Sequence, residues 1–329
     1  MPSQNGSEGI MRQMTVTLNI VTPLFLGGAD PNSAPELRVP SFRGVLRYWL
    51  RAALGGALGD QDMNSLRKAE AFVFGDTNNS SPIEIRLSYS RLSHMGYNPL
   101  PHKAKRFQFD GFNPDQTFSI SLVGRQVTAA SWRAAIDALL LAVRLGGMGR
   151  RSRRGFGSLC LKHVDISQAQ LSDPWSELLG QVPNSVSEWE QHLKAVLGAT
   201  EAEATDLAEN LGLSNFSPLS SPTFPILSPK NNIMLCHHVF SDWEDALKTF
   251  GRAEHVFLSR NPGRAQAFGS ANPRWASPLW VRVLPTKCGV ILALTLIWSQ
   301  PPPRLHANES DLRTFVLDFG RKWGGKWIV

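Results

Sequence analysis

The order of hydrophobic patterns over residues 14–166 limits the folds open to this chain more than any other feature. Residues 14–20 alternate apolar and polar side chains, which predicts a strand with one buried face. Further strand-like runs occupy residues 81–89, 117–123 and 157–166. Helical periodicity occupies residues 42–58 and 130–145. The resulting order of strand, helix, strand, strand, helix, strand predicts a ferredoxin-like unit, an antiparallel sheet with two helices on one face.

The second half of the chain also mixes strands and helices. Strand-like runs occupy residues 232–240, 279–284 and 290–298. Helical periodicity occupies residues 175–211, 241–258 and 310–323, with Ser241 as an expected N-cap. We therefore predict an α+β protein with two ferredoxin-like (RRM-like) domains, the second one decorated by additional elements. The predicted boundaries are a disordered tail at residues 1–13, a first domain at 14–168 and a second at 169–329.

A basic, glycine-rich tract joins the second predicted helix to the fourth predicted strand. This Arg/Gly loop, residues 144–157, reads RLGGMGRRSRRGFG and holds five arginines and five glycines but no acid. Glycine allows sharp turns and close backbone contacts, and the guanidinium fork suits phosphate. A solvated linker is the simpler alternative, but the glycines lie at both ends of the arginines and not throughout. We predict a surface loop that holds a polyanion.

Three other segments carry basic side chains suited to the same partner. Arg43, Arg47 and Arg51 recur every four residues along the first predicted helix, and Arg38 precedes it. We place Arg43 in the first turn, where a cation opposes the helix dipole unless an anion is also present.

The other two segments are an irregular insertion and a second basic loop. The insertion, residues 91–115, places Lys103, Lys105 and Arg106 among aromatic residues. This pattern suits phosphate contact with base stacking, or equally a loop whose aromatics fold back onto the core. The second basic loop, residues 259–278, is rich in glycine, proline and arginine.

The overall composition agrees with a nucleic-acid partner without proving one. The 34 basic residues exceed the 27 acidic residues, for a net charge of +7. The cysteines are three in number and far apart, as in a reduced cytoplasmic protein. We expect no secretory signal and no membrane span, because the longest apolar run is too short.

Several catalytic and cofactor motifs are missing from the sequence. The Arg/Gly loop has no G-K-[ST] ending, so it is not a nucleotide-binding P-loop, and it follows a helix instead of opening one. No pattern predicts a metal or another cofactor, because Cys236 and His238 lack a second ligand pair. His94 and His102 lie in the basic insertion and could act as acid and base in RNA cleavage.

The motifs together resemble the RAMP superfamily of CRISPR proteins. The resemblance rests on TPLFLGGAD at residues 22–30, LRVPSFRGVLRYWLRA at 37–52, FGD at 74–76 and GGMGRRSRRGFGSL at 146–159. Within the superfamily, the helix-preceding motif resembles the first RAMP subunit of type III-B, or Cmr-type, effector complexes. It implies two ferredoxin-like domains and a place in a cytoplasmic antiviral ribonucleoprotein, beside other RAMP subunits. Such a subunit would hold the 3′ portion of guide RNA, target RNA or both, and would not cleave RNA.

The basic segments and the resemblance together give one list of candidate RNA-binding residues. It comprises Gly27, Gly28, Arg38, Arg43, Arg47, Lys103, Lys105, Arg106, Arg144, Gly147, Met148, Gly149, Arg150, Arg151, Arg153, Arg154, Gly155 and Phe156. Two alternatives stay open. One is a metal-independent endoribonuclease of the same superfamily that processes guide precursor RNA through His94 or His102. The other is a scaffold whose arginines pair with acidic surfaces of neighbouring subunits.

Overall fold

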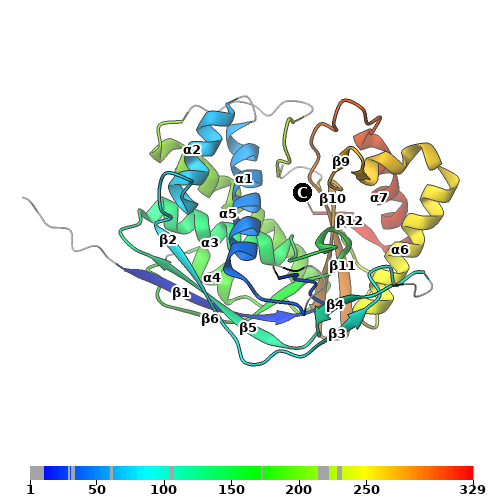
Figure 1. Ribbon diagram of the computed structural model, residues 1–329, viewed down its shortest axis with the longest axis horizontal. Coiled ribbons are helices and arrows are strands. Elements are labelled where there is room, and N and C mark those ends of the chain that lie inside the picture. Colours follow the sequence, from blue (N-terminus) through cyan, green and yellow to red (C-terminus); the bar gives the residue numbers. More distant parts are fainter. Residues whose placement is uncertain are drawn as a thin grey trace, which may run out of the picture.

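The computed structural model describes residues 11–28, 30, 34–59, 62–103, 107–171, 173–213, 222–227 and 232–328. Most of the predicted tail, and the predicted RNA contacts Lys105 and Arg106, lie outside these residues. Two sheets stand side by side, the first with its helices above it and the second with α6 and α7 at the right of Figure 1.

The first sheet has the strand order expected of a ferredoxin-like unit. It contains β1 (Arg12–Ile20), β2 (Ile83–Ser88), β5 (Thr117–Gly124) and β6 (Leu159–Gln168), in the order β2-β5-β1-β6 with antiparallel neighbours. Met14, Val16 and Leu18 are fully buried on the helix side of β1. The alternation that predicted this strand therefore directs its apolar side chains into the core.

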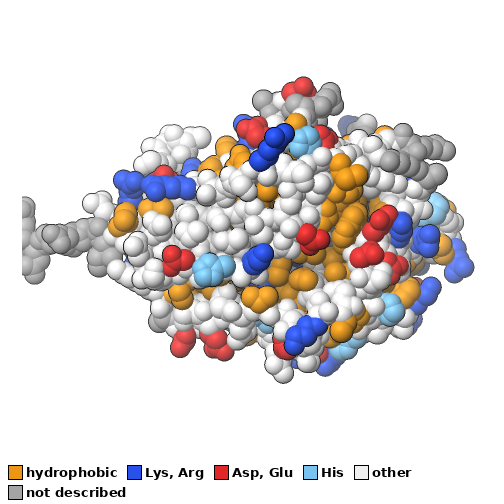
Figure 2. Space-filling view, turned by 90° about the horizontal axis from the view of Figure 1, so that it is seen from below, with side chains coloured by type: hydrophobic (Ala, Val, Ile, Leu, Met, Phe, Trp, Pro, Cys, Tyr) orange, Lys and Arg blue, Asp and Glu red, His pale blue; other side chains and the backbone are white. Residues whose placement is uncertain are grey.

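The outer face of this sheet is polar and largely uncharged. Thr15 and Ser121 hydrogen-bond across β1 and β5 at 2.8 Å, and Thr17 and Ser119 do so at 3.0 Å. Figure 2 views the molecule from the sheet side and shows a surface with scattered charges and much uncoloured polar area. An RRM stacks RNA bases on aromatic side chains of its sheet. The central strands of this sheet present hydroxyl groups at that face and not aromatic rings.

Three helices cover the inner face of the first sheet: α1 (Val39–Leu58), α2 (Met63–Phe74) and α3 (Ala129–Arg144). The helix α1 begins earlier than predicted, with Arg38 at the N-cap and Pro40 in the first turn, where proline is tolerated. Arg43 therefore lies beyond the first turn. The sequence did not predict α2, which the Asp62 side chain caps by accepting from the N–H groups of Asn64 and Ser65.

Two further helices, α4 (Trp175–Gly180) and α5 (Val186–Asn210), complete the helical layer of the first sheet. The helix α5 packs against α1 and α3, and its Trp189, Leu193 and Val196 belong to the same apolar core. These helices follow β6 in the chain, so a division by packing differs from the predicted boundary at residue 168. We propose that the first domain extends through about residue 213.

The second sheet repeats the ferredoxin-like order. It contains β7 (Ile233–Cys236), β10 (Leu279–Thr286), β11 (Gly289–Leu296) and β12 (Gly325–Trp327), in the order β10-β11-β7-β12. Its helices are α6 (Trp243–Arg260) and α7 (Glu309–Trp323). Asp242 caps α6, in place of the predicted Ser241, because its carboxylate accepts from the N–H groups of Glu244 and Asp245. The prediction of two ferredoxin-like units is confirmed.

Each unit carries an insertion near the junction of the two sheets. The insertion of the first unit, predicted to be irregular, forms a hairpin of β3 (His94–Tyr97) and β4 (Phe109–Phe112). That of the second unit follows α6 and contains the 3₁₀ helix η2 (Pro262–Phe268), β8 (Ser270–Ala271) and β9 (Arg274–Trp275). The units also meet directly, since Trp280 of β10 lies 5.3 Å from Trp49 of α1 between ring centroids.

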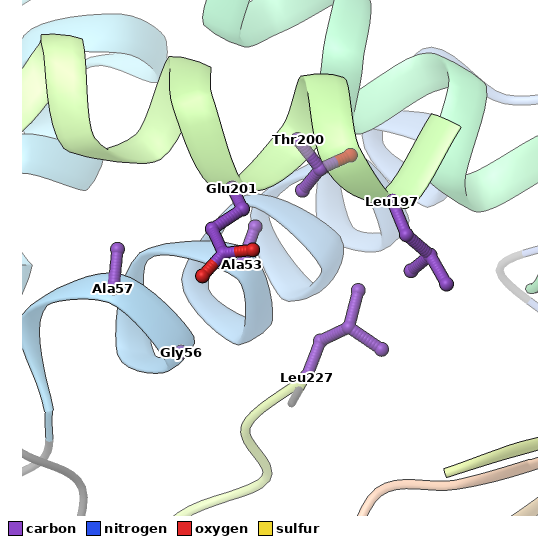
Figure 3. Close-up of a pocket in the computed structure, with 7 residues that line it drawn as sticks. All are labelled: Ala53, Gly56, Ala57, Leu197, Thr200, Glu201 and Leu227. Atoms are coloured by element: carbon purple, nitrogen blue, oxygen red, sulfur yellow. The ribbon is translucent and has the colours of Figure 1, made fainter. Parts of the chain in front are cut away.

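A small pocket opens between α1 and α5, lined by Ala53, Leu197, Thr200 and Leu227 among others (Figure 3). Its volume of about 20 Å³ accommodates no more than a water molecule, so it is not a substrate site. Among the described helices, none is long and apolar enough to cross a membrane.

Candidate nucleic-acid interface

The Arg/Gly loop is a fixed structure and not a flexible linker. It leaves α3, forms the 3₁₀ helix η1 (Ser152–Arg154) and enters β6. Its backbone is hydrogen-bonded to the segment that follows β1, residues 21–28. Arg150 N donates to Phe25 O at 2.8 Å, and Gly157 N donates to Pro23 O at 2.9 Å. The Arg150 guanidinium also lies beside Gly27, where a Cβ would come within 3.1 Å of Nη2.

Two glycines of the loop are required by these contacts. Gly149 has φ 80°, and a Cβ there would lie 2.2 Å from Phe25 O. Gly157 has φ 63°, and a Cβ there would lie 2.0 Å from Met148 O. Both positions combine a left-handed backbone with a close approach that only glycine permits. Gly149 and Gly157 therefore fix the backbone of the loop.

The loop faces the second basic loop across a groove of about 600 Å³. Guanidinium groups from both loops line it: Arg151, Arg153, Arg154 and Arg274. More than a hundred residues separate the two loops in the sequence, and only the docking of the second unit on the first brings them together.

Two of these arginines are anchored by neighbouring groups. Arg153 donates to Ser277 O and lies over Trp280, 4.8 Å from the ring centroid. Arg154 donates to Ser277 Oγ at 3.0 Å and pairs with Glu254 at 2.9 Å. These contacts hold both side chains in place, so binding a ligand would cost less side-chain entropy.

Arg151 and Arg274 are more available to a ligand. Arg274 is exposed on β9. Arg151 has a left-handed backbone, with φ 61°, and its buried Nε has no hydrogen-bond partner. Burial, followed by the charge of Arg154, lowers the pKa of Arg151. The groove thus gathers positive charge that suits a phosphate group.

Several of the predicted RNA contacts in the Arg/Gly loop are buried in this structure, so their contact with RNA stays a prediction. Arg144 is fully buried, donates to Gln181 O at 2.8 Å and lies 5.2 Å from the Trp189 ring centroid. Burial lowers its pKa to about 10. Met148 and Phe156 are 3% and 1% exposed and pack in the two cores. The backbones of Gly147 and Gly155 are buried as well. In this structure these residues shape the loop.

The arginines of α1 are largely engaged within the protein. Arg47 Nε donates to Glu70 Oε1 at 2.6 Å, and its Nη2 donates to Gly75 O at 2.9 Å. Arg51 pairs with the other oxygen of Glu70. Arg38 lies 3.8 Å from Glu36, and the buried Nε of Arg43 has no partner. The structure does not gather these residues around the groove, so RNA contact by Arg38 and Arg43 stays a prediction.

The insertion folds mostly back onto the core. Phe109 and Tyr97 pack against Phe25, at 5.5 Å and 6.5 Å between ring centroids, and Phe112 is buried. Phe107 is the exception, with half of its surface exposed. Arg150 lies over Phe109 at 5.6 Å, and Lys103 is exposed beside the loop. Of the two readings of this segment, core packing explains most of the aromatics.

The sequence missed Arg274 as a candidate and the pairing of the two basic loops. The only signal was the composition of residues 259–278, which resembles that of the Arg/Gly loop. Among the described residues, no cluster of three or more His, Cys, Asp or Glu side chains could hold a metal ion.

Two ferredoxin-like units with a glycine-braced basic loop at their junction define the class of RAMP-type proteins. The model of the RAMP superfamily matches residues 17–160. The chain is also 30% identical over 181 residues to the CRISPR system Cmr subunit Cmr1-2 of Pyrococcus furiosus, covering 45% of this chain and 95% of that protein. The chain belongs to the RAMP superfamily.

Within that family, the chain is homologous to Cmr1 proteins. It is 29% identical over 285 residues to Cmr1-1 of Pyrococcus furiosus, covering 76% of this chain and 77% of that protein. The crystal structure of apo Cmr1 from Pyrococcus furiosus superposes with a TM-score of 0.69 at 21% identity, over 96% of this chain and 98% of that one. A chain of the type III-B Cmr-β complex bound to cognate target RNA gives 0.61 at 12% identity, over 92% and 98%. These structures share the fold of this chain.

Proposed function

We propose that this chain is an RNA-binding, non-catalytic subunit of a type III-B CRISPR ribonucleoprotein in antiviral defence. In this role it holds guide RNA, target RNA or both, and contacts other RAMP subunits. Homology to proteins named as Cmr subunits supports membership in such a complex. Within the guide, the family resemblance favours the 3′ portion.

The observation that carries the proposal is the groove between the two basic loops. Four guanidinium groups line about 600 Å³, and two of them are held by Ser277 before any ligand arrives. Arginine forks match phosphate oxygens in geometry and charge, and they do not distinguish one base from another. A subunit that holds guides of varying sequence needs this kind of contact.

The test is to remove the two available arginines of the groove. In the Arg151→Ala/Arg274→Ala variant, we expect the affinity for single-stranded RNA to fall about tenfold at low salt, equal to about 1.4 kcal/mol. The slope of log K against log salt should also decrease in magnitude by about 1.4, since each phosphate contact on a single strand contributes about 0.7. Fluorescence anisotropy between about 50 and 200 mM salt measures both quantities.

The matched control removes two arginines elsewhere. Arg86 and Arg125 are exposed at the edge of the first sheet and both pair with Glu84. The Arg86→Ala/Arg125→Ala variant loses the same formal charge but should keep the affinity and slope of the unmodified protein within about twofold. Equal losses in both variants would mean that RNA responds to net charge alone and that the groove is not the binding site.

The His94–Asp110 pair is the observation that favours the endoribonuclease alternative. His94 Nδ1 lies 3.0 Å from both carboxylate oxygens of Asp110 on the exposed hairpin. A carboxylate that orients an imidazole is one part of an acid–base site. Incubation with precursor RNA should leave it intact. Specific products with 2′,3′-cyclic phosphate ends, lost in His94→Ala or His102→Ala, would instead establish the enzyme.

A further inference from the structure

A second group of basic side chains adjoins the groove on the side of α6. It comprises His102 and Lys103 of the insertion, Arg151 of the Arg/Gly loop, and Arg252 and His255 of α6. The rings of His102 and His255 are 6.1 Å apart between centroids and tilted by 32°. Three separate parts of the chain thus bring basic groups within electrostatic range of His102, and Arg151 belongs both to this cluster and to the groove.

The position of His102 is built into the fold. Its turn is closed by Lys103 N donating to Leu100 O at 2.9 Å, and Asn98 Nδ2 donates to Lys103 O at 3.1 Å. The ring lies directly against the backbone of α6 at Gly251, where a Cβ would come within 2.2 Å of Nδ1. Any larger residue at 251 would displace the imidazole, so the contact depends on this glycine.

Among the described residues, the groups whose charges act on His102 are all basic. Burial first, and then the charges of Lys103, His255, Arg151 and Arg252, lower the pKa of His102 to about 4. The carboxylate near Arg151 is that of Glu254, and it pairs with Arg154 at 2.9 Å. His102 is consequently neutral at physiological pH in the free protein, although it lies where an anion would favour its protonated form.

We propose that this cluster is a second phosphate-binding site for RNA and that phosphate binding there places a proton on His102. The proposal rests on the proposed function and extends it: the RNA backbone continues from the groove across Arg151 onto α6. A phosphate between Lys103, Arg151 and Arg252 offsets the charges that keep the imidazole neutral. RNA binding and proton uptake are then coupled, and each must strengthen the other by the same factor.

The test is the pH dependence of RNA affinity at constant ionic strength. If a bound phosphate returns His102 to the ordinary histidine pKa near 6.5, the affinity should be about tenfold higher at pH 5.5 than at pH 7.5. The His102→Asn variant should lose most of this dependence. The His163→Asn variant, which changes an exposed histidine of β6, should keep it. NMR titration of the His102 ring in the unmodified protein, with and without RNA, measures the same proton directly.

Two results would overturn the inference while leaving the proposed function in place. One is RNA binding that does not change between pH 5.5 and 7.5. The other is a pH dependence that persists in His102→Asn together with an unmoved His102 resonance. Failure to bind RNA at any pH in low salt would instead remove the proposed function, and the inference with it.

Discussion

The Gly157→Ala variant is expected to lose about 3 kcal/mol of unfolding free energy, the larger part from steric overlap. A left-handed backbone costs an alanine about 1 kcal/mol. The new Cβ would lie 2.0 Å from Met148 O, so the two ends of the loop must move apart. The hydrogen bond from Met148 N to Gly157 O, 3.0 Å long, would be strained or lost. Urea denaturation monitored by tryptophan fluorescence measures the change.

The same substitution at an open position provides the control. Gly198 lies within α5, and a Cβ there would meet no atom within 4 Å. The Gly198→Ala variant should therefore gain up to about 1 kcal/mol from the higher helix propensity of alanine. If Gly157→Ala were as stable as the unmodified protein, the loop could not be the fixed structure described above. RNA affinity should fall in Gly157→Ala and stay unchanged in Gly198→Ala.

The Arg133→Ala variant should be destabilised by about 1.4 kcal/mol at pH 8, because without its cation the buried Glu203 must be protonated about one pH unit above its pKa. Arg133 of α3 donates to Glu203 of α5 at 2.7 Å and to Asp206. Glu203 is 5% exposed, and burial raises its pKa to about 7 even beside Arg133. Asp137 lies nearby, and burial raises its pKa to about 8.

The loss of unfolding free energy in Arg133→Ala should depend on pH. An acid whose pKa is raised by folding contributes stability at low pH and loses it as the pH rises through the raised value. Without Arg133, the pKa of Glu203 should rise further. The difference between Arg133→Ala and the unmodified protein should accordingly be small at pH 5 and reach its maximum above pH 8. Urea unfolding at both pH values measures it.

A paired variant separates the charge effect from lost packing. Arg133→Met/Glu203→Gln removes both charges and keeps similar volumes, so it should recover most of the stability lost in Arg133→Ala. A difference between Arg133→Ala and the unmodified protein that is equal at pH 5 and pH 8 would contradict the electrostatic explanation.

The first sheet was largely predictable because its central strands are half-buried. Residues 14–20 alternate strictly, and every apolar member faces the helices. The sequence analysis missed α2 because its helical pattern is weak. Asp62 is a good N-cap, but few apolar residues precede Val73 and Phe74. The placement of α5 was unpredictable for another reason. An amphipathic pattern shows that a helix has a buried face, but not which sheet layer covers it.

The sequence predicted a basic candidate site at the Arg/Gly loop, but not which arginines line the groove. The arginines of the Arg/Gly loop look equivalent in the sequence, yet Arg144 ends a helix and packs on Trp189, far along the chain. Burial of this sort depends on tertiary contacts that local patterns do not contain. The approach of Arg274 and of α6 to the loop likewise depends on how the second unit docks, and no motif encodes that geometry.

The packing of α5 also bears on the order in which the chain can fold during synthesis. The strands of the first sheet are complete at Gln168, but α1 and α3 remain uncovered until α5, ending at Asn210, has been made. About 40 further residues must leave the ribosome before that core can close, which at typical translation rates takes several seconds. During this interval the nascent chain exposes apolar helix surface. A ribosome-bound chain ending near residue 168 should therefore recruit chaperones, and one extended past residue 213 should release them.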